Sequence, residues 1–346
     1  MVVGMTQMRK RRVVVRQLSA LEALGGVTNI CSDKTGTLTQ GQMVTRKAWL
    51  PGVGIYSLTK SNDATNPTRG TITLGKSPAT RQEAEQERER KRSEQDALRS
   101  AAGLKFDVPA EKEERDQRRK EEIRNEKQAE EDDDDEGSEG AVLPEVVPEL
   151  AAFLESAALC NLATVRYDEP AGSWQTMGDP TEVALQVFAH RFGFGKKSLE
   201  AENGWKPLAE YPFDSTVKRM SVIYKRDQGN GTVIFTKGAV ERILDLCTSV
   251  GFGEKREPMT PEMKEQVLDQ MGFLAEQGLR VLAIAQKPGP KSLDKNTEIP
   301  RDQVECDLTL LGLAGLYDPP RLETKDAVKG MYRPSYSYDC TQASIC

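Results

Sequence analysis

One long segment of this chain has too few apolar side chains to form a core, so it limits where folded domains can lie. Residues 81–136 contain 14 Lys and Arg and 21 Asp and Glu, and they end in EEDDDDE. Such a composition buries too little apolar surface to offset the entropy lost on ordering, although i,i+4 charge pairs support transient helix. We therefore expect a disordered insertion here, with the folded elements on either side of it.

The acidity of the chain belongs to this segment. Its net charge of −7 exceeds the −6 of the whole chain, so the remainder is nearly neutral. No basic stripe with interleaved aromatic residues is present, which argues against a nucleic-acid partner.

The six cysteines are widely spaced without a CxxC pair, and His190 is the single histidine. This pattern argues against zinc and is typical of reduced thiols in the cytosol.

The 346 residues can form two domains, because a single core stops growing near ~250–300 residues. No run approaches the roughly 20 apolar residues that span a bilayer, so we expect the chain as given to be soluble and cytoplasmic. The opening MVVGMTQMRKRR places its apolar part before its basic cluster, which is the wrong order for a secretory signal. The same order suits the cytoplasmic end of a membrane helix, and we interpret residues 1–12 as its remnant.

Hydrophobic periodicity predicts both helices and strands outside the charged segment. Strands are expected at 27–31, across 43–75, and at 220–224, 232–236, 281–286 and 308–316, with helices at 150–159, 239–247 and 261–278. DQGNG, between the third and fourth of these strand regions, is a hairpin signal. Residues 331–346 show no periodicity and are expected to be an unstructured tail.

The most specific motif is the nonapeptide CSDKTGTLT at residues 31–39. It follows the apolar run VTNIC, and a polar turn at the carboxyl end of a strand is where α/β sheets place their chemistry. An ordinary strand-to-helix turn would explain an Asp-Lys-Thr-Gly run considered alone. The whole nonapeptide resembles the phosphorylation motif of P-type cation-transporting ATPases.

That resemblance implies transfer of a phosphoryl group from ATP. Asp33 would be the nucleophile that forms an aspartyl-phosphate, Lys34 would offset charge, and the Thr37 hydroxyl and Gly36 amide would face phosphate oxygens. Mg²⁺ would take oxygen ligands from Asp33 and the Thr35 carbonyl. Related haloacid-dehalogenase-type phosphatases carry an acid at the position of Thr35, and that acid speeds dephosphorylation. Thr35 cannot act as an acid, so the resemblance implies a longer-lived phosphoenzyme.

Matches to the nucleotide-binding domain of the same family follow in order along the chain. GDPTE at 178–182 resembles its acidic motif, with Glu182 placed to accept a hydrogen bond from the adenine amine. A plain helix N-terminus explains the same residues equally well. FTKGAVERIL at 235–244 resembles the strongest signature of the domain, with Lys237 after a strand and Gly238 allowing the backbone close to the ligand.

Two weaker matches complete this set of ATP-binding residues. YPFDSTVKRMSV at 211–222 resembles the strand with the adenine-stacking phenylalanine, here Phe213, followed by Lys218 and Met220 lining the pocket. A lone phenylalanine usually belongs to a core, which is the alternative. Arg280, in GLRVLAIA, resembles the phosphate-contacting arginine of the family.

The resemblance implies a mixed α/β and α+β protein, in which a partial Rossmann-like (haloacid-dehalogenase-type) phosphorylation domain carries an inserted α+β nucleotide-binding domain. Residues 13–42 would start the phosphorylation domain. Residues 43–317, interrupted by 81–136, would form the nucleotide-binding domain. GLYDPPR would then be the hinge into a return segment at 318–330, and 331–346 resemble nothing in the family.

Within the family, LSALEALGGVTNICSDKTGTLTQGQMV resembles fungal sodium-exporting pumps. The implied parent exports Na⁺ or another monovalent cation such as K⁺ across the plasma membrane, with this region on the cytosolic side and membrane contact only through further segments. The family's TGE, TGD and GDGxND motifs do not occur here, so we expect the chain alone neither to transport nor to form a phosphoenzyme. The alternatives are an inactive nucleotide-binding module and an interaction protein that acts through 81–136.

Overall fold

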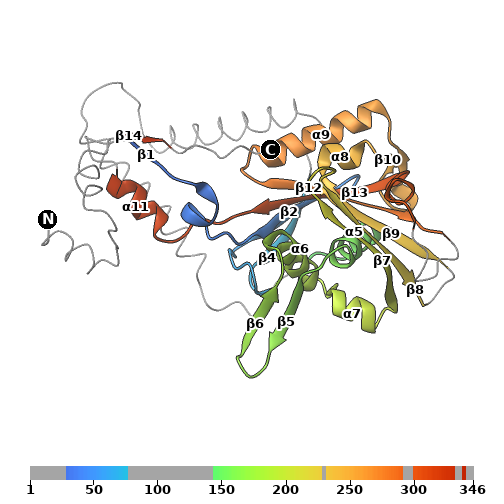
Figure 1. Ribbon diagram of the computed structural model, residues 1–346, viewed down its shortest axis with the longest axis horizontal. Coiled ribbons are helices and arrows are strands. Elements are labelled where there is room, and N and C mark those ends of the chain that lie inside the picture. Colours follow the sequence, from blue (N-terminus) through green and yellow to red (C-terminus); the bar gives the residue numbers. More distant parts are fainter. Residues whose placement is uncertain (1–28, 77–142, 228–230, 291–298, 332–336, 340–346) are drawn as a thin grey trace, which may run out of the picture. The chain divides into compact units, whose positions relative to one another are not determined.

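The computed structural model describes residues 29–76, 143–227, 231–290, 299–331 and 337–339. The expectations for residues 1–28 and for the charged segment 81–136 lie outside this part of the chain. The chain divides into two compact units (Figure 1). The larger is Met43–Tyr317, and the smaller combines Met1–Gln42 with Asp318–Cys346.

The larger unit is built on a ten-stranded, predominantly antiparallel sheet, in which eight strands follow the order β4-β3-β2-β13-β12-β9-β8-β7. The near-continuous apolar run of β13 explains its central place, because such a strand is buried on both faces. The short β10 pairs in parallel with β13 and antiparallel with β11. The strands are β2 Val44–Leu50, β3 Gly54–Thr59, β4 Thr71–Gly75, β7 Trp205–Asp214, β8 Arg219–Arg226, β9 Thr232–Ala239, β10 Cys247–Val250, β11 Glu257–Pro258, β12 Arg280–Pro288 and β13 Leu308–Tyr317.

Helices cover both faces of this sheet (Figure 1). Ile284 of β12 packs into a core shared with α5, α6 and α7, whereas its neighbours Ala283 and Ala285 pack with α8 and α9. Successive side chains of a strand point to opposite faces, so these two groups of helices lie on opposite sides of the sheet. The helices are α5 Pro148–Leu159, α6 Pro180–Arg191, α7 Lys196–Ala201, α8 Val240–Leu244 and α9 Pro261–Ala275, followed by the single-turn α10 Arg301–Val304.

Local sequence explains where α6 begins and how it holds a neighbouring hairpin. The Asp179 carboxylate accepts a hydrogen bond from the backbone N–H of Thr181 at 2.8 Å, and Pro180 occupies the first helical position. The two-stranded hairpin of β5 Thr164–Asp168 and β6 Ser173–Met177 packs Val165 against Val183 of α6. The helix start expected as an alternative for GDPTE is therefore present.

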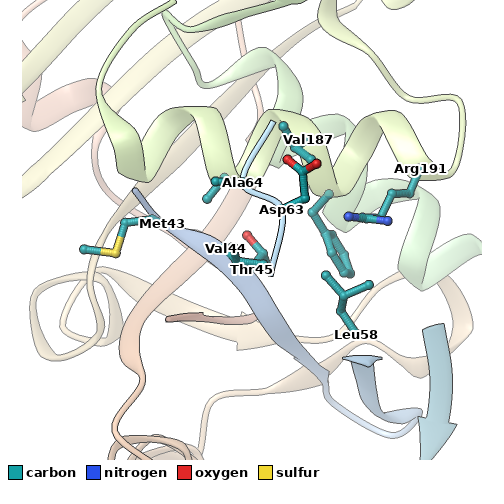
Figure 2. Close-up of a pocket in the computed structure, with 10 residues that line it drawn as sticks. Met43, Val44, Thr45, Leu58, Asp63, Ala64, Val187 and Arg191 are labelled. Carbon is teal, nitrogen blue, oxygen red and sulfur yellow. The ribbon is translucent and has the colours of Figure 1, made fainter. Parts of the chain in front are cut away.

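The C-terminal end of α6 fastens the loop between β3 and β4, beside a small pocket (Figure 2). The Arg191 guanidinium donates hydrogen bonds to the carbonyls of Asn66 and Pro67, both at 3.1 Å, and to that of Arg69. Burial lowers the pKa of Arg191 to about 10. Burial alone would raise the pKa of Asp63, but hydrogen bonds from Thr65 and Asn66 lower it overall. These contacts order the loop.

The smaller unit contains β1 Asn29–Cys31, a π-type turn at Lys34–Leu38, α11 Thr324–Met331 and β14 Ser337–Asp339. β1 pairs with β14 in parallel. The expectation that 331–346 is wholly unstructured is therefore wrong at β14. Strand pairing satisfies backbone N–H and C=O groups and needs no side-chain periodicity, so hydrophobic pattern gave no signal there.

Most of the expected elements of the larger unit are confirmed. Strands occur across 43–75 and at each of the four later strand positions, and α5 and α9 match the first and third expected helices. The helix expected over 239–247 is shorter, because α8 ends at Leu244 and β10 begins at Cys247. Of the helices in the described residues, none is long and apolar enough to span a bilayer.

Candidate functional site

The larger unit places a buried ammonium group beside a carboxylate. Lys237, near the end of β9, lies with its Nζ 2.7 Å from Oε1 of Glu182, in the first turn of α6. The side chains are only 8% and 13% exposed. Oε2 of Glu182 accepts a hydrogen bond from the backbone N–H of Leu162 at 3.1 Å. The pair fixes a positive charge at a defined position on the sheet.

A buried asparagine holds the loop that follows α5 against this ion pair. The Asn161 side-chain amide donates to the carbonyls of Ala157 at 3.2 Å and Glu182 at 2.9 Å, and its Oδ1 accepts from the N–H of Ala163 at 2.8 Å. Lys196 Nζ donates to the Asn161 carbonyl at 2.6 Å. Sequence reasoning missed Asn161 and Lys196, and only the position of Asn161 just beyond a helix end could have indicated the first.

Gly238 lets two strands approach closely beside Lys237. A Cβ added to Gly238 would lie 2.5 Å from the carbonyl oxygen of Lys218 and 2.7 Å from the Cβ of Arg219. Lys218 adopts a positive φ of 54°, and its carbonyl accepts a hydrogen bond from the N–H of Ala239 at 3.0 Å. The expected glycine requirement at this position therefore has a backbone cause, the close contact of β8 with β9.

Phe213 lies in a β-bulge at the end of β7. Tyr211 pairs with Ser221 and Asp214 with Arg219, so Pro212 and Phe213 together oppose the single residue Met220. Bulges re-aim side chains and are common beside functional sites. Phe213 is 59% exposed, which is unusual for a large aromatic residue and argues against the alternative that it belongs to the core.

Of the remaining two residues expected to bind ATP, one is buried and the other is exposed. Met220 is directly opposite Lys237 on the neighbouring strand, but it is 1% exposed and belongs to the hydrophobic core on the side of α5. Arg280 is exposed at the start of β12. It lies four residues along the strand from Ile284, which is the partner of Lys237. Lys237, Met220 and the bulge at Phe213 thus lie side by side on three adjacent strands.

The expected phosphorylation motif forms a tight turn in the smaller unit. Asp33 precedes the turn in an extended conformation, and its side chain makes no capping hydrogen bond. Within the turn, Thr35 is extended and Gly36 has a positive φ of 77°, which glycine adopts without strain. The side chains of Asp33, Lys34, Thr35 and Thr37 are exposed. The turn therefore presents the expected nucleophile to solvent.

Residues of the return segment hold this turn in shape. The Asp318 carboxylate accepts hydrogen bonds from the Thr39 hydroxyl at 2.6 Å and the Gly41 N–H at 3.0 Å. Arg321 donates to the carbonyl of Thr39 at 3.1 Å and to that of Gly36 at 2.8 Å. Sequence reasoning treated GLYDPPR only as a hinge and missed these contacts, which join residues about 280 apart in sequence.

The donor set for a metal ion is incomplete in the described residues. Mg²⁺ prefers six oxygen ligands and commonly keeps several waters. The Asp33 carboxylate and Thr35 carbonyl are oxygen donors of the right type, so they fit a partial site. Among the described residues, no three His, Cys, Asp or Glu side chains converge as a metal site would require.

Known proteins resemble the chain over both units. The family described as P-type ATPase, cytoplasmic domain N, matches residues 149–323. A sodium/potassium exporting P-type ATPase of Schizosaccharomyces pombe is 42% identical over 333 residues, which cover 96% of this chain and 27% of that protein. A second such protein, from Saccharomyces cerevisiae, is 36% identical over 365 residues, covering 96% of this chain and 30% of its own length.

More distant relatives carry other names. A calcium-transporting ATPase of Bacillus subtilis is 28% identical over 343 residues, which cover 99% of this chain and 29% of that protein. The chain thus spans less than a third of the length of these curated relatives.

Proposed function

Because the chain belongs to the P-type ATPase family through its cytoplasmic N domain, we propose that the unit Met43–Tyr317 binds ATP. The observation that carries this proposal is the arrangement of Phe213, Met220 and Lys237 on the adjacent strands β7, β8 and β9. Two strand spacings separate the backbones of Phe213 and Lys237 by about 10 Å. That separation suits a ligand with an aromatic base at one end and phosphates at the other.

Phe213 and Lys237 would have distinct tasks in binding, whereas Met220 between them is buried in the core. The exposed ring of Phe213 would stack on adenine, which is worth ~1–3 kcal/mol for aromatic platforms that bind nucleotides. The ammonium of Lys237 would attract the phosphates. Gly238, which has no side chain, would let the backbone come close to them. Lys218 and Arg280 would add positive charge at the edges of the site.

Glu182 would position Lys237 and could still serve the base. Both of its carboxylate oxygens accept a hydrogen bond, from Lys237 and from Leu162. Each oxygen retains a second lone pair, so the adenine amine could also donate to it. We propose the positioning of Lys237 as its main task, because a buried ammonium needs a charged partner.

The smaller unit would supply the nucleophile. A carboxylate oxygen of Asp33 would attack the γ-phosphorus of ATP, forming an O–P bond while the bond to the β–γ bridging oxygen breaks and ADP leaves. Lys34 would offset charge on the phosphoryl oxygens, and the Thr37 hydroxyl and Gly36 amide would hydrogen-bond to them. Mg²⁺, held in part by Asp33 and Thr35, would neutralise charge that develops in the transfer.

The names of the fungal relatives suggest the process that this chemistry serves. We propose that a protein containing this chain exports Na⁺ or K⁺ at a membrane, with these residues on the cytosolic side and an aspartyl-phosphate at Asp33. That the chain alone neither transports nor forms a phosphoenzyme stays a prediction.

Calorimetric titration of the 346-residue chain with ATP tests the binding proposal. Phe213→Ala is expected to weaken ATP binding about 5- to 150-fold, and Lys237→Ala to weaken it as well. The matched controls are Tyr167→Ala, which removes another exposed aromatic ring, and Lys264→Ala, which removes another ion-paired lysine. Unchanged affinity in both Phe213→Ala and Lys237→Ala would refute the assignment.

A further inference from the structure

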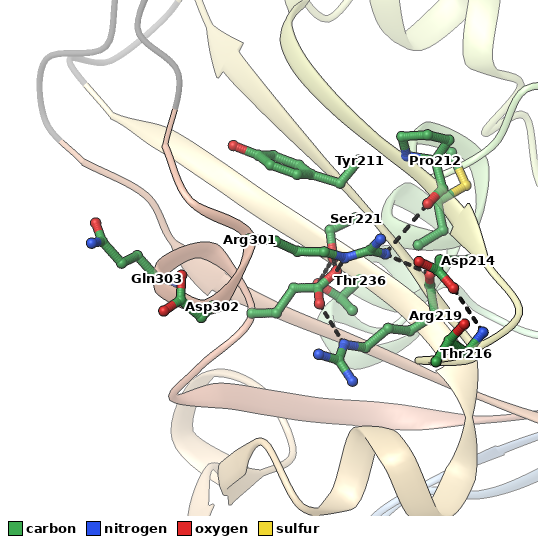
Figure 3. A network of polar contacts seen from close by, with 12 residues as sticks. Tyr211, Pro212, Asp214, Thr216, Arg219, Ser221, Thr236, Arg301, Asp302 and Gln303 are labelled. Carbon is green, nitrogen blue, oxygen red and sulfur yellow. Dashed lines mark hydrogen bonds and ion pairs between the residues drawn. The ribbon is translucent and has the colours of Figure 1, made fainter.

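Arg219, Ser221 and Arg301 belong to one polar network (Figure 3), which is centred on the buried carboxylate of Glu305. Ser221 follows Met220 on β8, and Met220 is directly opposite Lys237, so the network lies on the sheet face opposite Lys237. Oε1 of Glu305 accepts hydrogen bonds from the Ser221 hydroxyl and from Nε of Arg301, both at 2.8 Å. Its Oε2 forms an ion pair with Arg219. The Ser221 hydroxyl also lies 2.9 Å from that of Thr236. The Glu305 side chain is fully buried, whereas the side chains of Arg219 and Arg301 are 17% and 26% exposed.

Arg301 connects this carboxylate to the bulge that carries Phe213. Its Nη2 donates to the carbonyl of Pro212 at 3.3 Å and to that of Arg219 at 2.7 Å. The Pro212 carbonyl lies within the bulge on β7, and the Arg219 carbonyl lies on the neighbouring strand β8. In addition, the Tyr211 hydroxyl donates to the carbonyl of Ile299 at 2.8 Å. One guanidinium therefore spans the bulge while its Nε is fixed by Glu305.

The bulge needs such a contact because it disrupts the ladder of β7 with β8. Pro212 has no N–H, and bulged residues lose their regular backbone partners. A carbonyl without a partner can rotate, and the direction of the next side chain changes with it. The hydrogen bond from Arg301 holds the Pro212 carbonyl, so it limits the directions open to Phe213.

We propose that Arg301, oriented by Glu305, is a positioning residue for the aromatic platform of Phe213 and thus for the base of a bound adenine nucleotide. This inference rests on the proposed ATP-binding function. Buried ion pairs contribute little net stability compared with apolar packing, whereas their directional hydrogen bonds fix geometry. The network accordingly fixes the direction of the Phe213 side chain.

A double-mutant cycle in the 346-residue chain tests the inference. ATP affinity is measured by calorimetry for the unmodified chain, Arg301→Gln, Phe213→Ala and the double variant. Arg301→Gln is expected to weaken binding about 3- to 10-fold, as for the loss of a hydrogen bond, and less than Phe213→Ala does. In the Phe213→Ala background, Arg301→Gln should change affinity by less than about twofold, because no ring remains to be aimed.

Two further measurements separate positioning from general loss of structure. Affinity for inorganic triphosphate, which has no base, should be the same with and without Arg301→Gln, whereas a loosened fold would weaken both ligands. Arg166→Gln, at an exposed arginine of the β5–β6 hairpin, is the matched control. Arg301→Gln combined with Glu305→Gln removes one positive and one negative charge, so the net charge of the network stays the same. Arg301→Lys keeps the charge but loses the planar fork of the guanidinium, so a second variant is available if one fails to fold.

The outcomes distinguish this inference from the function on which it rests. Additive losses in the cycle would overturn the inference, and so would an unchanged affinity in Arg301→Gln while Phe213→Ala weakens binding. In both cases ATP binding by the larger unit would stand. An unmodified chain that binds no ATP would overturn the proposed function and the inference together.

Discussion

The Nζ of Lys237 lies 2.7 Å from the Oε1 of Glu182, and this contact joins the end of β9 to the first turn of α6. The two residues are 55 positions apart in sequence. The side chains are only 8% and 13% exposed, so water screens the attraction weakly. A cation held in this way keeps its position before a ligand arrives, which lowers the ordering cost of binding.

Replacing the acid of this pair should cost stability. Glu182→Gln leaves the Lys237 ammonium without a charged partner, and we expect the free energy of unfolding in urea to fall by about 1–3 kcal/mol. Adding Lys237→Met should recover most of the loss. Glu202→Gln, at the exposed end of α7, is the control and should have little effect. Equal effects of Glu182→Gln and Glu202→Gln would contradict the account.

Because β8 and β9 approach closely at Gly238, a larger residue there should lower stability. In Gly238→Ala the new Cβ would meet the Lys218 carbonyl at 2.5 Å, and overpacking of this kind costs about 1–3 kcal/mol. Thermal unfolding should therefore shift to lower temperature, and ATP affinity should fall. Gly272→Ala in α9 meets nothing within 4 Å and should be neutral or stabilising, because alanine favours helix. Equal tolerance of the two substitutions would contradict this packing.

Stability should depend on pH through the single histidine. Burial lowers the pKa of His190, whose ring lies 5.9 Å from that of Trp174. The unfolded chain binds the proton more readily than the folded chain does. The contribution of His190 to stability is therefore fully present above the unfolded pKa of about 6.5, and it is lost as the pH falls below that value. Urea unfolding at pH 7.5 and 5.8 should show a smaller loss for His190→Gln than for the unmodified chain. The same loss in both would remove His190 as the cause.

Arg321 should control the order of the turn that carries Asp33. Its guanidinium donates to the carbonyls of Gly36 and Thr39, so Arg321→Gln should speed hydrogen exchange of the backbone amides in residues 34–41. Leu322→Ala, at a neighbouring side chain that is 91% exposed, is the control. Exchange that is equally slow in Arg321→Gln would mean that other contacts hold the turn.

Periodicity and local motifs predicted much of the larger unit. β13 is an apolar run, and β8 and β9 flank a turn signal, so these elements carry their information in adjacent residues. The bulge at Pro212 and Phe213 could not be predicted in this way. It depends on the register of β7 with β8, which the sequence states only through long-range pairing.

The polar contacts of the site were the least predictable part. Arg301 and Glu305 are four residues apart on one helical turn, which is a local signal, but their link to Ser221 spans 84 residues. Asp318 and Arg321 likewise act on a turn that lies far away in sequence. A residue type shows that a side chain can donate or accept, and only the fold decides its partner.

Hydrogen exchange of the 346-residue chain with and without ATP tests the central claim most directly. We expect ATP to slow exchange of the backbone amides in residues 213–220 and 237–239, at the bulge and beside Lys237. Residues 43–45 and 63–64, which line the pocket in Figure 2, should be unaffected. Bound ATP that slows exchange only at 43–45 and 63–64, or leaves 213–220 and 237–239 unchanged, would contradict it.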